Sequence, residues 1–267
     1  MLCFLQTLYF RPYLVLLLKN ILYFCAQNVI ILNMGRSISF TILFFMMLSV
    51  LVSCHQSHKR ELDLAYTLAE SKPDSALAFL NRINQGKLSD KDMAKYALIY
   101  YMAQDKSGLD VDNDSLIRIA YDWYGEHQDD SLYATTLYYM GKCFLLNDSM
   151  EQAKSCLEKS YSISDSLHNM NLKCLALDKL IEVEEQLAPD TALKYAKALV
   201  KMYDSTPNVS IYNKVAARLR LCDNFMFVDS LRQALCEGQI ALKLAMKDAD
   251  RNLYSFVCQD LANVYEK

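Results

Sequence analysis

The sequence predicts an all-α protein in which helical hairpins stack into a solenoid, and three observations lead to this fold class. The composition combines 53% hydrophobic residues with 6 Gly and only 4 Pro among 267 residues, which is typical of a helical protein with little irregular chain. From Leu62 onward, apolar residues recur at intervals of three and four, as amphipathic helices require. Asp is also followed by Ser or Thr at near-regular intervals, and we interpret these pairs as repeated helix starts.

The Asp-Ser and Asp-Thr pairs fall into two interleaved sets. Asp and Ser side chains accept hydrogen bonds from the free N–H groups that open a helix, so each pair predicts a helix start. The intervals are 40, 34, 42 and 39 residues in one set and 35 and 39 in the other. Two helix starts in each period of about 34–45 residues are typical of a helical-hairpin solenoid. The first set is Asp74-Ser75, Asp114-Ser115, Asp148-Ser149, Asp190-Thr191 and Asp229-Ser230, and the second is Asp130-Ser131, Asp165-Ser166 and Asp204-Ser205.

The first 53 residues form a leader that carries only three charges, at Arg11, Lys19 and Arg36. Its apolar run at 38–52 is short for a membrane span. The run is typical of the hydrophobic region of a secretory signal, with Arg36 as the charge that precedes it. We therefore predict a signal peptide at 34–53.

A lipidation motif ends this signal. An aliphatic residue, a small pair and a Cys match the lipobox of bacterial lipoproteins, in which the Cys is lipidated and becomes the new amino terminus: Leu51, Val52, Ser53 and Cys54. The polar residues that follow make 54–60 the expected lipidated tether. The two or more acyl chains of such a Cys suffice for stable anchoring in the membrane. The alternative is a membrane anchor in which Cys54 is incidental.

Residues 1–33 precede a signal peptide that is already complete without them. Met34, Gly35 and Arg36 supply a full n-region, so we expect Met34 to be the true start and 1–33 to be a non-native upstream extension. The competing interpretation is an extra membrane helix over 13–32, which the polar residues inside that stretch weaken.

Helix pairs fill the predicted repeat domain at 61–267. The first two helices are separated at Ser71-Lys72-Pro73, because Pro is tolerated at the first position of a helix but not in its interior. The same break recurs at Ala188-Pro189-Asp190. With the Asp-Ser pairs, these breaks predict helix pairs at about 60–84, 90–125, 132–163, 168–203 and 209–245 and a single helix from about 250.

The central pair carries a family resemblance. A spacing of L-x2-M-G-x2-F followed by A-x3-L resembles the tetratricopeptide repeat (TPR), whose pattern is W-x2-L-G-x2-Y followed by A-x3-F. Leu137 replaces the Trp, Leu157 replaces the Phe, and the closing Pro is absent. The resemblance implies that small residues lie where the two helices approach most closely, at Gly141 and Ala153.

Further partial copies follow. Leu221-Cys222-x2-Phe225 and then Ala234 repeat the pattern, with Cys222 in the small-residue position. Leu261-Ala262-x2-Tyr265 matches the first helix of another repeat. A solenoid ends in a capping helix with a polar outer face, so we expect the repeat domain to be truncated at the C-terminus and the apolar stripe of this last helix to be exposed.

The lipobox followed by degenerate repeats resembles the TPR lipoproteins of Gram-negative bacteria. That resemblance implies a right-handed superhelix, anchored to a membrane through Cys54 and facing the periplasm or the cell surface. It implies a non-enzymatic scaffold that binds a protein or an extended peptide. The alternative is the periplasmic sensory region of a signalling or transcription-regulating protein whose C-terminal output domain is missing.

The charge balance argues against nucleic-acid binding, and the motifs argue against catalysis. The mature part has 25 basic against 31 acidic residues, and nucleic-acid binding requires a cationic footprint instead. The four His residues, at 55, 58, 127 and 168, cannot be placed beside one nucleophile, and no Ser lies in a G-x-S-x-G setting. We expect no catalytic site, no small-molecule substrate and no cofactor.

An acidic segment at 110–114, DVDND, resembles the start of an EF-hand loop. Ser115 stands in the place of the turn Gly and Tyr121 in the place of the bidentate Glu, so we expect a solvated loop and no metal.

Beyond Cys54, the mature part has cysteines at 143, 156, 174, 222, 236 and 258, without C-x2-C spacing. A disulfide is permitted beyond the inner membrane, but we favour buried free thiols.

Tyrosines are dense across the second and third helix pairs. Packing between stacked hairpins explains most of them. Tyr and Trp also make low-entropy anchors for peptides, so part of the set is a candidate peptide-binding groove. The candidates are Tyr100, Tyr101, Tyr138 and Tyr139.

Overall fold

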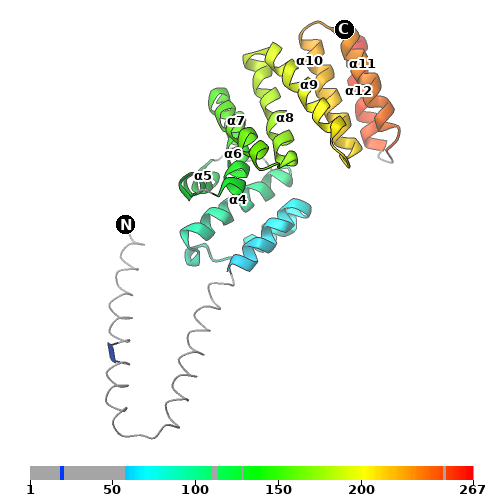
Figure 1. Ribbon diagram of the computed structural model, residues 1–267. Coiled ribbons are helices and arrows are strands. Elements are labelled where there is room, and N and C mark those ends of the chain that lie inside the picture. Colours follow the sequence, from blue (N-terminus) through cyan, green and yellow to red (C-terminus); the bar gives the residue numbers. More distant parts are fainter. Residues whose placement is uncertain (1–18, 21–57, 110–113, 128, 249–250, 267) are drawn as a thin grey trace. The chain divides into compact units, whose positions relative to one another are not determined.

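The computed structural model describes residues 19–20, 58–109, 114–127, 129–248 and 251–266 (Figure 1). The chain divides into two units, Met1–His58 and Lys59–Lys267. The lipobox, Leu51, Val52, Ser53 and Cys54, lies outside the described residues, as does most of the leader, so lipidation stays a prediction. None of the helices that the structure describes is both long and apolar enough to cross a membrane.

The second unit is built from helices, and its described residues contain no strand, which confirms the all-α prediction. A helix at 58–71 opens the series, and the predicted pairs follow in order. The elements are α3 (Pro73–Leu80), the 3-10 turn η1 (Gln85–Lys87), α4 (Asp90–Lys106), α5 (Ser115–His127), α6 (Asp130–Leu146), α7 (Met150–Ser166), α8 (Met170–Leu187), α9 (Pro189–Ser205), α10 (Ile211–Phe227), α11 (Leu231–Ala245) and α12 (Arg251–Glu266).

These helices form two layers. Each helix from α3 to α12 packs against the next one along the chain (Figure 1). Alternate helices also touch, because α4 contacts α6, α6 contacts α8 and α10 contacts α12. We call the helix at 58–71 and α4, α6, α8, α10 and α12 the A helices, and α3, α5, α7, α9 and α11 the B helices. The arrangement is a solenoid of TPR-like helical hairpins.

The predicted close approach at Gly141 is confirmed. A Cβ at this position would lie 2.6 Å from Leu157 Cγ and 3.4 Å from the carbonyl oxygen of Ala153. The next copy uses a polar contact at the equivalent crossing, where the Cys222 thiol donates a hydrogen bond to the Ala234 carbonyl at 3.2 Å. Side-chain size therefore fixes how closely α6 packs on α7, as the TPR pattern implies.

The Asp-Ser pairs of the first set lie at the starts of the B helices, as predicted. Their capping chemistry differs from the prediction, because Ser149 and Ser230 occupy N-cap positions without accepting a backbone hydrogen bond. Asp148 and Asp229 instead adopt φ of 54°. Short polar side chains tolerate this left-handed conformation, so these Asp residues end one helix and turn the chain into the next.

Two pairs of the second set were predicted wrongly as helix starts. Asp165-Ser166 lies at the end of α7 and Asp204-Ser205 at the end of α9. The next A helices begin later, where Asn169 and Ser210 accept hydrogen bonds from the backbone N–H groups of Leu172 and Asn213. Asp165 and Asp204 instead form ion pairs that tie one repeat to the next, with Lys173 and Arg218 as their partners.

All six cysteines that the structure describes are free. Burial raises the pKa of Cys156 to about 11 and that of Cys222 to about 12, so these thiols stay protonated and act as small core side chains. Cys143 and Cys174 are also buried, whereas Cys236 is exposed and Cys258 is half-buried.

The last helix differs in part from the expected exposed stripe. Leu261 is buried, because its side chain fills the space over Gly238, where a Cβ would lie 2.6 Å from Leu261 Cδ2. Ala262 and Tyr265 are exposed, as predicted, and Tyr265 retains 65% of its accessible surface. The first-helix residues of this copy therefore pack back onto α11 on one side only.

Candidate functional site

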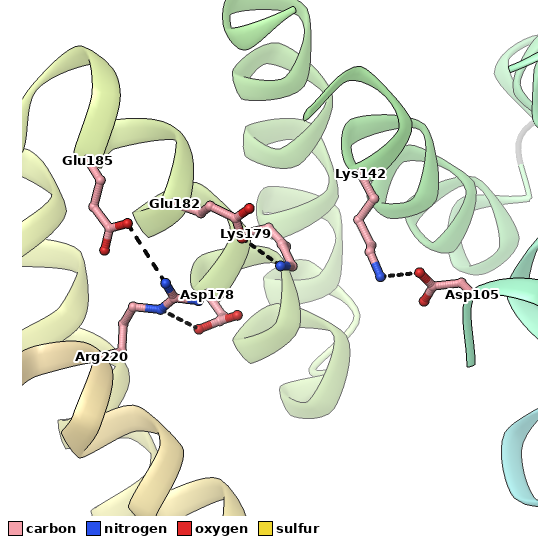
Figure 2. Close-up of polar contacts among 7 residues, drawn as sticks. All are labelled: Asp105, Lys142, Asp178, Lys179, Glu182, Glu185 and Arg220. Carbon is pink, nitrogen blue, oxygen red and sulfur yellow. Dashed lines mark hydrogen bonds and ion pairs between the residues drawn. The ribbon is translucent and has the colours of Figure 1, made fainter. Parts of the chain in front are cut away.

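A strip of charged side chains runs across successive A helices (Figure 2). α4 contributes one residue to this charged strip, α6 one, α8 four and α10 one. Within α8, three acids are spaced by four and three residues, which places them on one face of the helix. The members of the charged strip are Asp105, Lys142, Asp178, Lys179, Glu182, Glu185 and Arg220.

Ion pairs connect α6 to α4 and α10 to α8 along this strip. Lys142 of α6 pairs with Asp105 of α4. The Arg220 guanidinium of α10 reaches back to α8, where its Nε lies 3.4 Å from Asp178 Oδ1 and its Nη1 lies 3.8 Å from Glu185 Oε2. These contacts fix the relative orientation of neighbouring repeats and leave charged groups on the surface of the A helices, which we call the A-helix face.

A pocket lies at the α10 end of the charged strip. Its volume is about 240 Å³, and it combines charged and apolar side chains. Phe227 retains 63% of its accessible surface, which is a large exposed fraction for an aromatic residue. The lining residues are Glu185, Arg220, Asp223, Met226 and Phe227.

One carboxylate of this pocket is held by neighbours. Asn224 Nδ2 donates a hydrogen bond to Glu185 Oε1 at 2.8 Å and another to the Arg220 carbonyl at 2.9 Å. Burial raises the pKa of Glu185, and the nearby Arg220 charge opposes that rise. Asn224 is itself 1% exposed, so Glu185 and Arg220 belong to a fixed polar cluster.

The other lining carboxylate, Asp223, has no such partners in the part of the chain that the structure describes. Burial and the nearby Asp260 of α12 raise the pKa of Asp223 to about 6, although Arg220 opposes the shift. Burial also raises the pKa of Asp260. Among the described residues, Asp223 forms no hydrogen bond or ion pair with its side chain. Near neutral pH the pocket therefore holds a half-buried negative charge that forms no direct ion pair with a described residue, because the nearby Arg220 pairs with Asp178 and Glu185.

The charge balance of the charged strip and its pocket follows from these residues. In the charged strip and the pocket, with Asp260 included, described carboxylates outnumber described cations by six to three. A ligand that carries positive charge complements such a surface. The carboxylates are Asp105, Asp178, Glu182, Glu185, Asp223 and Asp260, and the cations are Lys142, Lys179 and Arg220.

The predicted groove tyrosines lie mostly in the core. Tyr101 and Tyr139 are 1% and 4% exposed and meet edge to face with ring centroids 5.9 Å apart. Tyr138 is 6% exposed and packs against Tyr139. Tyr100 is half-exposed and stacks on Tyr96 at 5.7 Å. Burial of this kind leaves Tyr101 and Tyr139 no surface for a ligand.

Tyr138 nevertheless belongs near the charged strip. Lys142 Nζ lies 5.9 Å from the centroid of its ring. Burial raises the pKa of Tyr138, and the negative charge of Asp105 adds to this effect. The mostly buried Tyr138 ring therefore lies beside the Lys142 side chain of the charged strip.

The acidic segment at 110–113 lies outside the described residues. Asp114, which follows it, pairs with Arg118 one turn along α5. The described residues contain no group of three or more His, Cys, Asp or Glu side chains that could hold a metal ion. His127 stacks on Trp123 with centroids 3.7 Å apart, and its Nδ1 lies 2.8 Å from the Trp123 carbonyl oxygen.

The charged strip was not predicted from the sequence, although two signals pointed to it. Asp178, Glu182 and Glu185 recur at helical spacing within one predicted helix. Lys142 and Asp223 directly follow the small residues of two repeat copies, Gly141 and Cys222, so they occupy equivalent positions.

Solved structures share the fold of this chain. No protein-family model matches the chain, and no curated protein matches it either. Among solved structures, BtubC of P. vanneervenii has a TM-score of 0.55 at 16% sequence identity, covering 79% of this chain and 81% of its own. A Podosopora anserina protein described as a kinesin light chain with nearly identical TPR-like repeats has a TM-score of 0.54 at 10% identity, covering 71% of this chain and 95% of its own. These likenesses show a TPR-like fold.

Proposed function

We propose that this protein is a non-enzymatic scaffold that binds an extended segment of a protein partner along its A-helix face. The TPR-like fold supports this proposal, because stacked helical repeats form an extended surface on which a protein chain can lie. One observation carries the location of the site: the charged strip crosses successive A helices and ends at a pocket with an exposed aromatic side chain. A chain lying across the repeats would meet charged groups from several helices at once.

Membrane attachment is part of the same proposal. The lipobox at Leu51, Val52, Ser53 and Cys54 supports a lipid anchor, and the short tether at 54–60 would hold the repeats close to the membrane. A lipoprotein of this kind would present its repeats in the periplasm or on the cell surface. The partner would then be another component of the cell envelope.

Charge reversal on the two layers tests the location of the site. Glu182→Arg changes the A-helix face, whereas Glu158→Arg makes the same change on the exposed surface of the B helix α7. Partners captured by the anchored wild-type protein from its own membranes are identified and then quantified with both variants. We expect Glu182→Arg to reduce capture and Glu158→Arg to leave it unchanged. Equal capture by both variants would place binding elsewhere.

A further inference from the structure

The pocket between α8 and α10 has one carboxylate that forms no direct ion pair among the described residues. Arg220 is already engaged with Asp178 and Glu185 of α8. Glu185 has Arg220 and Asn224 as partners. Asp223 is therefore the lining carboxylate that remains available to a ligand.

The same pocket has an apolar side. Met226 and Phe227 follow Asp223 by three and four residues, so they lie next to it on the surface of α10. Phe227 leaves 63% of its accessible surface in water. Covering apolar surface is worth about 25 cal/mol per Å². A ligand that places a cation at Asp223 and an apolar group on Phe227 would satisfy both sides of the pocket.

We propose that this pocket takes a lysine or arginine side chain of the bound peptide, with a neighbouring large apolar residue of that peptide packed on Phe227. The inference rests on the proposed function and names the chemistry that the partner segment carries. A long basic side chain suits the site because its apolar stem contacts Met226 and Phe227 while its charge reaches Asp223.

Other ligands fit less well. An anion would meet Asp223, Glu185 and the Asp260 charge on α12, with Arg220 already committed. A metal ion would need several ligating groups together, and the described residues contain no such cluster. An apolar side chain alone would bury the charge of Asp223 without a partner, which is costly.

A matched set of probe peptides tests the inference. Each probe is a twelve-residue Gly-Ser peptide with a central pair, which is Lys-Phe, Gln-Phe or Glu-Phe. Each probe is titrated into the ¹⁵N-labelled full-length protein, and the shifts of the backbone amides report both the affinity and the place of binding. We expect the Lys-Phe probe to shift amides of α8 and α10, with an affinity ~10-fold higher than that of the Gln-Phe probe, which corresponds to about 1.4 kcal/mol.

Two isosteric variants sharpen the test. Asp223→Asn removes the available charge, and Asp122→Asn removes an exposed charge on the B helix α5. We expect the first to lower the affinity for the Lys-Phe probe ~5- to 10-fold and the second to leave it unchanged. Lowering the pH through 6 should weaken binding to the wild-type protein as Asp223 takes up a proton, and not to the Asp223→Asn variant, with Glu185, Asp260 and Arg220 common to both.

The outcomes separate this inference from the proposed function. Equal affinity for the three probes, or an Asp223→Asn variant that binds like the wild type, overturns the choice of a basic side chain. Shifts that still map to other A helices then keep the A-helix face as the binding surface. Shifts confined to B helices contradict both proposals. Absence of any shift with the Lys-Phe probe overturns the inference alone, because the charge-reversal capture experiment judges the proposed function separately.

Discussion

Glu184 of α8 is fully buried, and its carboxylate Oε1 lies 2.7 Å from the Nζ of Lys154 on α7. The pair joins the B helix of one repeat to the A helix of the next. A buried carboxylate that loses its countercharge keeps its desolvation cost without the compensating attraction. This ion pair therefore makes the central repeats depend on one another.

Removing the cation of this pair should destabilise the protein more than neutralising the acid. We expect Lys154→Met to lower the melting temperature, and Glu184→Gln to lower it less, because the amide keeps the shape of the side chain and removes the buried charge instead of leaving it without its countercharge. Lys159→Met, an exposed position on the same helix, is the matched control. Equal melting temperatures for Lys154→Met and Lys159→Met would show that Glu184 does not depend on its partner.

Two glycines give a second comparison. Gly141→Ala should destabilise the protein by about 1–3 kcal/mol, because the new Cβ would meet Leu157 Cγ at 2.6 Å. Gly125→Ala should stabilise it by up to about 1 kcal/mol, because Ala favours the helix and the new Cβ would lie 3.6 Å from the Tyr133 ring, an ordinary contact. Urea unfolding measures both changes. A stabilising Gly141→Ala would contradict the close crossing of α6 and α7.

The repeat register was predictable because it depends on local spacing. Gly141 and Ala153 lie within one hairpin, so their sequence separation already determines that they meet. Asp165-Ser166 was misread because an Asp-Ser pair looks the same whether it opens a helix or follows its last turn. Only the position of the next cap, at Asn169, decides between the two.

The site was less predictable because it depends on contacts between repeats. Dense tyrosines indicate buried packing and ligand contact alike, and burial of Tyr101 and Tyr139 becomes visible only when α4 and α6 are placed side by side. The Arg220 contacts to α8 likewise join residues 42 positions apart along the chain for Asp178. Sequence spacing predicts which residues share a helix face, but not which neighbouring helix they meet.

Lipidation of Cys54 is a third prediction. A labelled fatty acid should enter the full-length protein produced in a Gram-negative host, because Leu51, Val52 and Ser53 precede this Cys at the end of an apolar run. Cys54→Ala should abolish the label and leave a larger, unprocessed precursor. Cys236→Ala, at an exposed Cys of the repeats, is the control and should keep the label. Label that persists in Cys54→Ala would contradict the anchor.

The last prediction concerns the pH dependence of stability at Asp223. Burial and Asp260 raise its pKa to about 6 in the folded protein, above the usual value of 3.8. The folded state therefore binds a proton more tightly than the unfolded state, so ionisation of Asp223 destabilises the fold above pH 6, and this cost disappears as the pH falls below 4.

Asp223→Asn should therefore be more stable than the wild type at pH 7.5, by about 1–3 kcal/mol. The difference should shrink as the pH falls through 6, because the wild-type carboxyl becomes neutral too. Urea unfolding of both proteins at pH 7.5 and pH 4.5 measures it, and because Asp260, Glu185 and Arg220 are present in both, the comparison isolates Asp223. Retaining an ionised carboxylate at this position lowers stability, a cost that the proposed binding role of Asp223 would explain. An Asp223→Asn variant that is less stable than the wild type at pH 7.5 would show that the carboxylate has a structural partner.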